Sequence, residues 1–324
     1  MISVIVPTYN YGRFIGECLD SLLQQTYANW ECLVMDNASV DNTESIVRDY
    51  ANHDARIRYH KLPENKGPSF ARNQALKEAK GEYILFLDAD DLIAPEKLKH
   101  TMDIFEKQNV DFVFSDYCFF TESREYITKT YSFSEKQIKP GVIGSAEIRN
   151  RLVYGNIFAI SCIISRKKNL EHLAWFDEVI RYNEDWDLWL RASFADTSYY
   201  YDQQPDSVTL IRNHMTSHSK DQFGMYIAGL YVCLKNYKAL SKAQQKIFDR
   251  KIRTHRYTLK KKLIDRYFNN RERFDESLVI MDQMPGFENE LRSYRRKKWI
   301  MPRSLESLYL LFLKMNYRIA QKCL

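Results

Sequence analysis

The chain has 324 residues, which is enough for one large domain or two modest ones. With 45% hydrophobic and 28% charged residues, its composition is ordinary for a globular protein. Six scattered cysteines with no C-x-x-C pair exclude a disulfide framework or a zinc site, and they predict buried free thiols in a reducing compartment. No apolar run reaches the length of a membrane span, and the first residues enter a strand without a basic region, so we expect no signal peptide and a cytoplasmic protein.

Charge is divided unevenly along the chain, whose net charge is +6. Residues 241–324 contain 21 Lys and Arg against 9 Asp and Glu, which leaves 27 against 33 for residues 1–240. A basic tail of this kind is typical of proteins that meet phosphate groups, either in a nucleic acid or on an anionic membrane.

The first 120 residues alternate between apolar runs and segments with helical spacing. Continuous apolar runs predict buried strands at 2–7, 30–36, 57–62, 82–88 and 111–120. Helical periodicity between them predicts helices at 13–25, 41–50, 67–81 and 95–108. Alternation of strands and helices predicts an α/β fold with a mostly parallel, Rossmann-like sheet covered by helices on both faces.

The rest of the chain is less regular. Residues 121–155 look like an insertion, after which strands are predicted at 159–165 and 207–214. The second half of 175–194 has helical spacing, and from about residue 221 the pattern is helical and basic. We therefore expect two regions, residues 1–220 and a helical C-terminal extension of residues 221–324.

Polar clusters follow three of the predicted parallel strands, at 7–10, 36–39 and 88–91. Because such strands end at one edge of the sheet, we expect the clusters to form a single ligand-binding rim. If the strand continues, Asp88 and Asp90 point the same way, and a divalent cation would relieve their repulsion. Hard oxygen ligands suit Mg²⁺ or Mn²⁺. An Asp-rich turn before the next helix is the alternative, and Asp91 fits it equally well.

No P-loop and no dinucleotide-binding glycine pattern follows the first strand, so metal and cationic side chains must hold any phosphate. Five motifs in order nevertheless resemble the inverting family 2 glycosyltransferases, which have the GT-A fold. They are "VIVPTYN" (4–10), "DNASVDNT" (36–43), "NKGPSFARNQAL" (65–76), "FLDADD" (86–91) and "NEDWDLWLR" (183–191). The resemblance covers about residues 1–220.

The resemblance implies a nucleotide-sugar donor. It has Asp36 accept a hydrogen bond from the uracil imide, which favours a UDP donor, while Asp41 supports the same loop. Arg72 would reach the sugar or diphosphate, Asp88 the ribose or nucleotide, and Asp90 would ligate the Mn²⁺ or Mg²⁺ that bridges the phosphates. The other implied nucleotide-sugar contacts are Pro7, Thr8, Tyr9, Asn10, Ala89 and Arg212. A turn or cap role for Asp36 and Asp41, and a solvated helix position for Arg72, are the alternatives.

The same resemblance places the chemistry in segment 183–191. Asp185 would be the base that deprotonates the acceptor hydroxyl. Glu184 would lie beside it on the acceptor side, and Trp186 would offer a face to a sugar ring, whereas Trp189 would pack in the core. The alternative is that these acids only favour a helix N-terminus through its dipole.

Residues 210–220 resemble the flexible closing segment of these enzymes. Arg212, His214, Ser217 and Ser219 would clamp the diphosphate, and His214 would also be a further metal ligand. A lone histidine is more often not a metal ligand, so it stays open whether His214 binds the metal or not.

The basic tail includes residues 292–304, which mix Arg and Lys with Trp299 and Ile300. Since the family resemblance implies a lipid-diphosphate acceptor at the inner membrane face, we expect this tail to dock on an anionic membrane. A solvated helical face or an oligomer contact is the alternative. We expect no nucleic acid partner beyond the donor nucleotide.

The leading hypothesis is an inverting, metal-dependent glycosyltransferase that moves a hexose or N-acetylhexosamine from a UDP-sugar to a glycan or lipid-linked acceptor in surface polysaccharide synthesis. A sugar-phosphate nucleotidyltransferase is the alternative enzyme, but it would need a Gly-rich basic loop that "PTYNYGRF" (7–14) matches poorly. A third hypothesis is a non-catalytic scaffold of a membrane glycan-assembly complex. The joint presence of Asp88, Asp90 and Asp185 argues against the scaffold.

Overall fold

The computed structural model describes residues 1–121, 127–215, 217, 220–269, 275, 277 and 281. The chain divides into two compact units, Met1–Leu259 and Lys260–Leu324, and the elements described below lie in the first, apart from the end of α9 (Lys242–Asn269). This division lies later than the boundary expected near residue 220. The reason is that α8 (Gln222–Asn236) packs on α7 (Glu184–Ala192), which binds the beginning of the helical region to the rest of the first unit.

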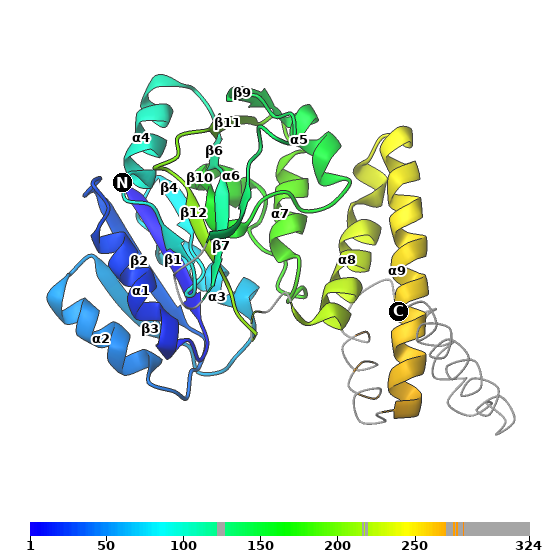
Figure 1. Ribbon diagram of the computed structural model, residues 1–324, viewed down its shortest axis with the longest axis horizontal. Coiled ribbons are helices and arrows are strands. Elements are labelled where there is room, and N and C mark those ends of the chain that lie inside the picture. Colours follow the sequence, from blue (N-terminus) through cyan, green and yellow to red (C-terminus); the bar gives the residue numbers. More distant parts are fainter. Residues whose placement is uncertain are drawn as a thin grey trace, which may run out of the picture. The chain divides into compact units, whose positions relative to one another are not determined.

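The centre of the first unit is an eight-stranded sheet with the order β3-β2-β1-β4-β10-β6-β11-β9 (Figure 1). Strands β3, β2, β1 and β4 are mutually parallel, β10 and β9 run against their neighbours, and β6 and β11 are parallel to each other. The predicted mostly parallel sheet is confirmed. The strands are β1 (Ile2–Thr8), β2 (Trp30–Asp36), β3 (Ile57–Lys61), β4 (Tyr83–Phe86), β6 (Phe112–Ser115), β9 (Gly141–Gly144), β10 (Ile163–Arg166) and β11 (Ser198–Asp202).

Helices cover both faces of this sheet, as expected (Figure 1). The apolar stripes of α1 (Gly12–Leu23), α2 (Thr43–His53) and α4 (Lys97–Lys107) share one core with alternate residues of β1. The other face carries α3 (Pro68–Glu78), which contacts β1 and β2. Helix α3 starts where predicted, because Gly67 takes a φ of 91° and Pro68 occupies the first turn.

A second, four-stranded sheet was not predicted. Its order is β5-β12-β7-β8, made of β5 (Leu92–Ile93), β7 (Tyr117–Thr121), β8 (Ile127–Tyr131) and β12 (Thr209–Asn213). The apolar run expected to form one strand at 111–120 therefore breaks at Asp116, where the chain passes from one sheet to the other. The carboxylate of Asp116 holds this break by accepting hydrogen bonds from Phe133 N and Tyr201 Oη.

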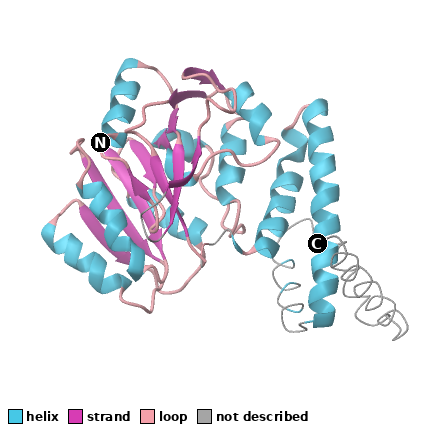
Figure 2. Cartoon of the chain, in the orientation of Figure 1, coloured by secondary structure: helices cyan, strands magenta, loops and turns pink. Residues whose placement is uncertain are grey.

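The remaining described elements are helical, and Figure 2 shows them in cyan beside the magenta sheets. They are α5 (Ser145–Leu152), the short turn η1 (Ile160–Cys162), α6 (Lys167–His172), η3 (Tyr237–Ala239) and α9 (Lys242–Asn269). No helix among the described residues is long and apolar enough to cross a bilayer. Five cysteines are buried free thiols as predicted, and Cys323 lies outside the described residues.

Candidate active site

The predicted rim forms at the carboxyl ends of β1, β2 and β4. Parallel pairing sets Thr8 opposite Asp36, and β4 lies on the other side of β1. The acidic cluster follows β4 but is a turn, since the strand ends at Phe86 and Asp91 N donates to Asp88 O at 3.0 Å. We expected Asp88 and Asp90 to point the same way because of strand alternation. Since the strand ends before them, the turn and not strand alternation sets their directions.

Asp91 is buried at the base of this turn. Its carboxylate accepts hydrogen bonds from Ser161 Oγ at 2.9 Å and from the backbone of Arg212 at 3.1 Å. Burial and the charges of Asp90 and Asp88 raise the pKa of Asp91 well above its usual range. Ser161 also accepts a hydrogen bond from Asp88 N at 3.2 Å, so it supports the turn twice. No motif marked Ser161 in the sequence, because its role exists only after η1 folds beneath the rim.

Arg72 connects the two acidic segments of the site. Its guanidinium donates to Asp88 at 2.7 Å and to Glu184 at 2.7 Å, and the residue is only 3% exposed. The solvated position considered for Arg72 is wrong. Within the described part of the chain, its Nε has no hydrogen-bond partner. Burial raises the pKa of Asp88, opposed by Arg72 and reinforced by the charge of Asp90. The buried cation thus holds the β4 turn against the beginning of α7.

His214 follows β12 and meets the acidic turn, with Nε2 at 2.8 Å from Asp90 Oδ2. Its ring is buried against Phe14, and Arg13 Nη2 lies 3.4 Å from Nδ1. A carboxylate oxygen suits Mn²⁺ and Mg²⁺, and the imidazole nitrogen beside it favours a transition metal such as Mn²⁺ over Mg²⁺. No group of three His, Cys, Asp or Glu that could hold a metal occurs among the described residues. Asp90 and His214 fit such a metal only if ligand oxygens complete its coordination.

The side chain of Arg212 is buried, donates to Asp90 O and Glu17 Oε2, and packs between the rings of Phe14 and Phe120. These contacts make Arg212 a brace between α1, β12 and the acidic turn, and its contact with a diphosphate stays a prediction. Ser217 Oγ accepts from the backbone of His214 at 3.3 Å, and Ser219 lies outside the described residues.

Asp36 was expected to meet a nucleobase, but it is fully buried. One of its oxygens accepts from Ser39 N at 2.8 Å and the other from Tyr59 Oη at 2.5 Å. Asp36 therefore shapes the loop after β2, as its turn alternative held, and its contact with uracil stays a prediction. Asp41 supports the same region, since its carboxylate accepts from Gly12 N and Thr43 N, both at 3.0 Å.

The segment after β1 supplies the remaining predicted donor contacts. Tyr9 is 42% exposed, and Asn10 has a φ of 57° and bonds the β2 loop through Ser39 Oγ at 2.8 Å. The hydroxyl of Thr8 is buried and has no hydrogen-bond partner within the described residues. A buried hydroxyl without a partner is costly unless a ligand satisfies it. Of the two other predicted residues, Pro7 is half-buried in β1 and Ala89 is buried in the acidic turn.

Asp185 lies in the first turn of α7, beside Glu184. Its Oδ2 accepts from Asn156 Nδ2 at 2.7 Å and its Oδ1 from Trp186 N at 2.8 Å. Burial and the neighbouring charge of Glu184 raise the pKa of Asp185 to about 7. A carboxylate with this pKa can accept and release a proton near neutral pH. Asn156 was not recognised in the sequence, because a single loop Asn carries no pattern.

Trp186 does not present the sugar-binding face predicted for it. The residue is 3% exposed, its Nε1 donates to Leu152 O at 2.8 Å, and its ring meets Phe248. This corrects the prediction for Trp186, whereas the core position expected for Trp189 is confirmed by its full burial.

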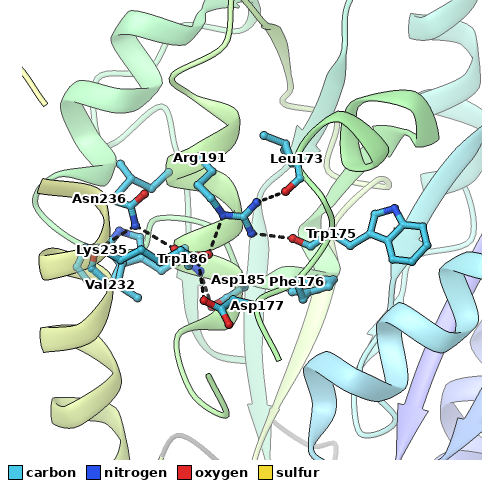
Figure 3. A network of polar contacts seen from close by, with 12 residues as sticks. Leu173, Trp175, Phe176, Asp177, Asp185, Trp186, Arg191, Val232, Lys235 and Asn236 are labelled. Atoms are coloured by element: carbon cyan, nitrogen blue, oxygen red, sulfur yellow. Dashed lines mark hydrogen bonds and ion pairs between the residues drawn. The ribbon is translucent and has the colours of Figure 1, made fainter. Parts of the chain in front are cut away.

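Asp187, two residues after Asp185 in α7, is fully buried in a polar network whose partners Arg191, Lys235 and Asn236 are labelled in Figure 3. It accepts from Arg191 Nε at 2.8 Å, Lys235 Nζ at 2.9 Å and Asn236 Nδ2 at 2.9 Å. Lys235 also donates to Asp177 at 2.7 Å, and Figure 3 shows these side chains converging from α7, α8 and the loop before α7. The network fixes α7, and with it Asp185.

Comparisons with known proteins bear on the family and the fold of the chain. The family model described as "Glycosyl transferase family 2" matches residues 3–173. An uncharacterized glycosyltransferase of Rickettsia typhi is 31% identical over 211 residues, which are 63% of this chain and 62% of that protein. WfgD of Escherichia coli, a UDP-Glc:alpha-D-GlcNAc-diphosphoundecaprenol beta-1,3-glucosyltransferase, is 41% identical over 117 residues, 36% of this chain and 46% of that protein. The chain thus spans less than two thirds of each relative.

Among solved structures, S. aureus TarS 1–349 in complex with UDP-GlcNAc is similar with a TM-score of 0.63 at 22% sequence identity, covering 88% of this chain and 81% of that chain. At this identity the likeness shows the fold, which is the α/β GT-A fold expected from the motifs. Because the family model covers more than half of the sequence, the chain belongs to glycosyltransferase family 2.

Proposed function

We propose that this chain is an inverting glycosyltransferase that transfers a hexose or N-acetylhexosamine from a UDP-sugar to a glycan or lipid-diphosphate acceptor. The observation that carries the proposal is Arg72, which draws the turn with Asp88 and Asp90 to the helix start with Asp185. A nucleotide-sugar held at the rim would then have a proton acceptor of pKa about 7 beside it. The names of WfgD and of the TarS complex support the choice of a UDP-sugar.

In this mechanism Asp185 takes the proton of the acceptor hydroxyl while that oxygen attacks the anomeric carbon, and UDP leaves from the opposite face. Asn156 and Trp186 N hold the carboxylate in place during this step. Asp90 and His214 would hold a Mn²⁺ or Mg²⁺, which, when bound, neutralises the charge of the diphosphate. The unpartnered Thr8 hydroxyl and Arg72 Nε would meet polar groups of the donor.

The proposal is tested by a nucleotide-release assay with UDP-glucose, UDP-galactose, UDP-N-acetylglucosamine and UDP-N-acetylgalactosamine. GDP-mannose is the control donor with a different nucleotide. We expect release from one UDP-sugar with Mn²⁺ or Mg²⁺ and none with EDTA, and a β-linked product from an α-linked donor. Release of pyrophosphate would point to a nucleotidyltransferase. No turnover with any donor and several acceptors would favour the scaffold.

For the membrane, we propose that the exposed face of α9 docks on anionic lipid. Lys246, Arg250 and Arg253 are exposed at spacings of four and three residues, so they share one side of the helix. Each basic residue near anionic lipid gains about 1 kcal/mol. The tail 292–304 with Trp299 and Ile300, which also carried this expectation, lies outside the described residues.

Flotation with vesicles of phosphatidylcholine, with and without phosphatidylglycerol, checks this docking. We expect binding only to the anionic vesicles at low salt, and loss of binding when all three basic residues are changed to Glu. The matched control reverses the charge of exposed Lys77 and Lys80 on and after α3, which should leave binding unchanged. A parent chain that does not float with anionic vesicles at low salt would contradict the proposal.

A further inference from the structure

The loop that follows α5 lies directly beside the start of α7. The last residue of α5, Leu152, accepts a hydrogen bond from Trp186 Nε1 at 2.8 Å. At the other end of the loop, Phe158 is buried and packs against the ring of Phe114. The segment 153–158 is therefore anchored at both ends, and its middle is set at the edge of the proposed catalytic centre.

Asn156 points from the middle of this loop to Asp185. Its Nδ2 donates to Asp185 Oδ2 at 2.7 Å, while its Oδ1 accepts from Phe158 N at 3.3 Å. The second bond fixes which end of the amide faces the carboxylate, because the amide oxygen is already used as an acceptor. Asp185 thus receives a neutral, oriented donor that favours its ionised form against burial and the charge of Glu184.

Tyr154 lies between the two anchors and turns outwards. Its side chain is 68% exposed, although it is only two residues from Leu152 and two from Asn156. Successive Cα atoms are about 3.8 Å apart, so the Cα of Tyr154 lies within about 8 Å of the Cα of Asn156, whose amide bonds the proposed base. An exposed tyrosine offers an apolar face and a polar hydroxyl, the pair of features that a sugar ring matches. No packing role in the described residues accounts for it.

We propose that the segment 153–158 forms the acceptor side of the site, with Tyr154 as a platform for the acceptor sugar and Asn156 as the residue that positions Asp185. The inference rests on the proposed glycosyltransferase function, and it assigns to that function a binding surface for the second substrate. Nucleotide and sugar donor bind on the rim of β1, β2 and β4, and the acceptor approaches from the loop after α5.

The platform is tested by comparing Tyr154→Ala with Tyr257→Ala, which removes a tyrosine of similar exposure, 71%, from α9. The acceptor probe is N-acetylglucosamine α-diphosphate with a short alkyl chain, and UDP release is measured with and without it. We expect Tyr154→Ala to raise the KM for the probe about tenfold, as the loss of one aromatic contact implies. Tyr154→Trp should retain the parent KM, and Tyr257→Ala should match the parent both in KM for the probe and in hydrolysis of the donor.

Equal acceptor KM values in the parent and Tyr154→Ala chains, or no transfer to the probe by either, would overturn the platform. These outcomes are separable from failure of the proposed function, since the parent chain would still hydrolyse a UDP-sugar. Absence of hydrolysis with every donor would instead sink the proposed function itself.

Positioning by Asn156 is tested through the pH profile of donor hydrolysis, which needs no acceptor sugar. Loss of its donor should raise the pKa of Asp185, so the acid limb of kcat/KM in Asn156→Ala moves to higher pH and the rate recovers in alkaline buffer. Asn156→Gln should restore part of the shift, and Asn150→Ala, an exposed Asn on α5, should show none. A uniform loss at every pH with an unmoved limb would overturn the assignment.

Discussion

The acidic turn 88–91 and the acidic helix start 184–187 have similar compositions, but the fold uses them differently. Each gives one carboxylate to Arg72, which bonds Asp88 and Glu184 at the same distance of 2.7 Å. The two segments are more than 90 residues apart in sequence, so this buried cation converts two local charge clusters into one site. Because Asp88 and Glu184 share Arg72 as their counter-ion, moving the two segments apart would leave at least one of these carboxylates without its charged partner.

The last carboxylate of each segment, Asp91 or Asp187, is buried and accepts hydrogen bonds from other parts of the protein. Asp91 accepts from a hydroxyl and a backbone amide, whereas Asp187 accepts from two cations and an amide. The remaining carboxylate of each segment differs most between the two. Asp90 contacts the imidazole of His214, whereas Asp185 accepts hydrogen bonds from neutral donors. Similar acidic motifs thus yield one group suited to hold charge and one suited to move a proton.

Asp185→Asn is the strongest test of this difference. Removing a general base costs about 10²- to 10⁴-fold, so we expect kcat for transfer to fall by about a thousandfold. Asp196→Asn, at an exposed carboxylate after α7, should retain full activity. An Asp185→Asn variant that turned over like the parent would remove Asp185 from the mechanism.

The same substitution should not weaken the fold above neutral pH. Between pH about 4 and about 7 the folded chain holds a proton on Asp185 that the unfolded chain has lost, so its contribution to stability falls as pH rises through this window. At pH 8 the parent therefore carries a disfavoured buried charge. We expect Asp185→Asn to melt at the same or a higher temperature than the parent at that pH.

The sequence contained enough information for the rim but not for the details of its chemistry. Apolar runs and a Pro68 start located β1, β2 and α3, because burial on both faces leaves a continuous pattern. The motif order placed Asp88, Asp90 and Asp185 near one another. What the periodicity missed depends on packing from distant segments. It comprises the burial of Asp36, Arg212 and Trp186, the break at Asp116 and the second sheet.

Those misses have a common physical reason. The local sequence around a side chain such as Arg212 is the same whether it faces a ligand or a core. Packing against the rings of Phe14 and Phe120 is what buries Arg212. Polar partners of the same kind, such as Ser161 for Asp91, come from segments 70 residues away. Periodicity reports which face of one element is apolar, but it does not report which second element will cover a polar residue.

Arg72→Ala breaks the link between the two segments and should mainly reduce stability. Removing one partner of a buried ion pair leaves uncompensated charge, so we expect a loss of about 3 kcal/mol in the free energy of unfolding. Urea denaturation of parent and variant measures it. Arg48→Ala, at an exposed pair with Glu44, should cost far less. A loss as small as that of the control would show that Arg72 does not hold the segments together.

Asp187→Asn tests the structural role of Asp187, whose carboxylate bonds α7 to α8. The neutral amide still accepts hydrogen bonds, but Lys235 and Arg191 lose a charged partner, so we expect about 1–2 kcal/mol of destabilisation. A double-mutant cycle with Lys235→Met isolates the pair. Additive effects in that cycle would show that the network in Figure 3 does not couple α7 to α8.

Glu184→Gln should have the smallest effect and gives the sharpest view of how the helix start tunes its base. The charge of Glu184 raises the pKa of Asp185, and Arg72 opposes it. In the proposed mechanism Asp185 acts when ionised, so kcat/KM of the parent should fall as pH drops through about 7. The Gln side chain keeps an acceptor for Arg72 while removing the charge, so the acid limb should move to lower pH by less than about one unit. A limb that stays in place or moves upward would mean that Glu184 does not set the pKa of the base.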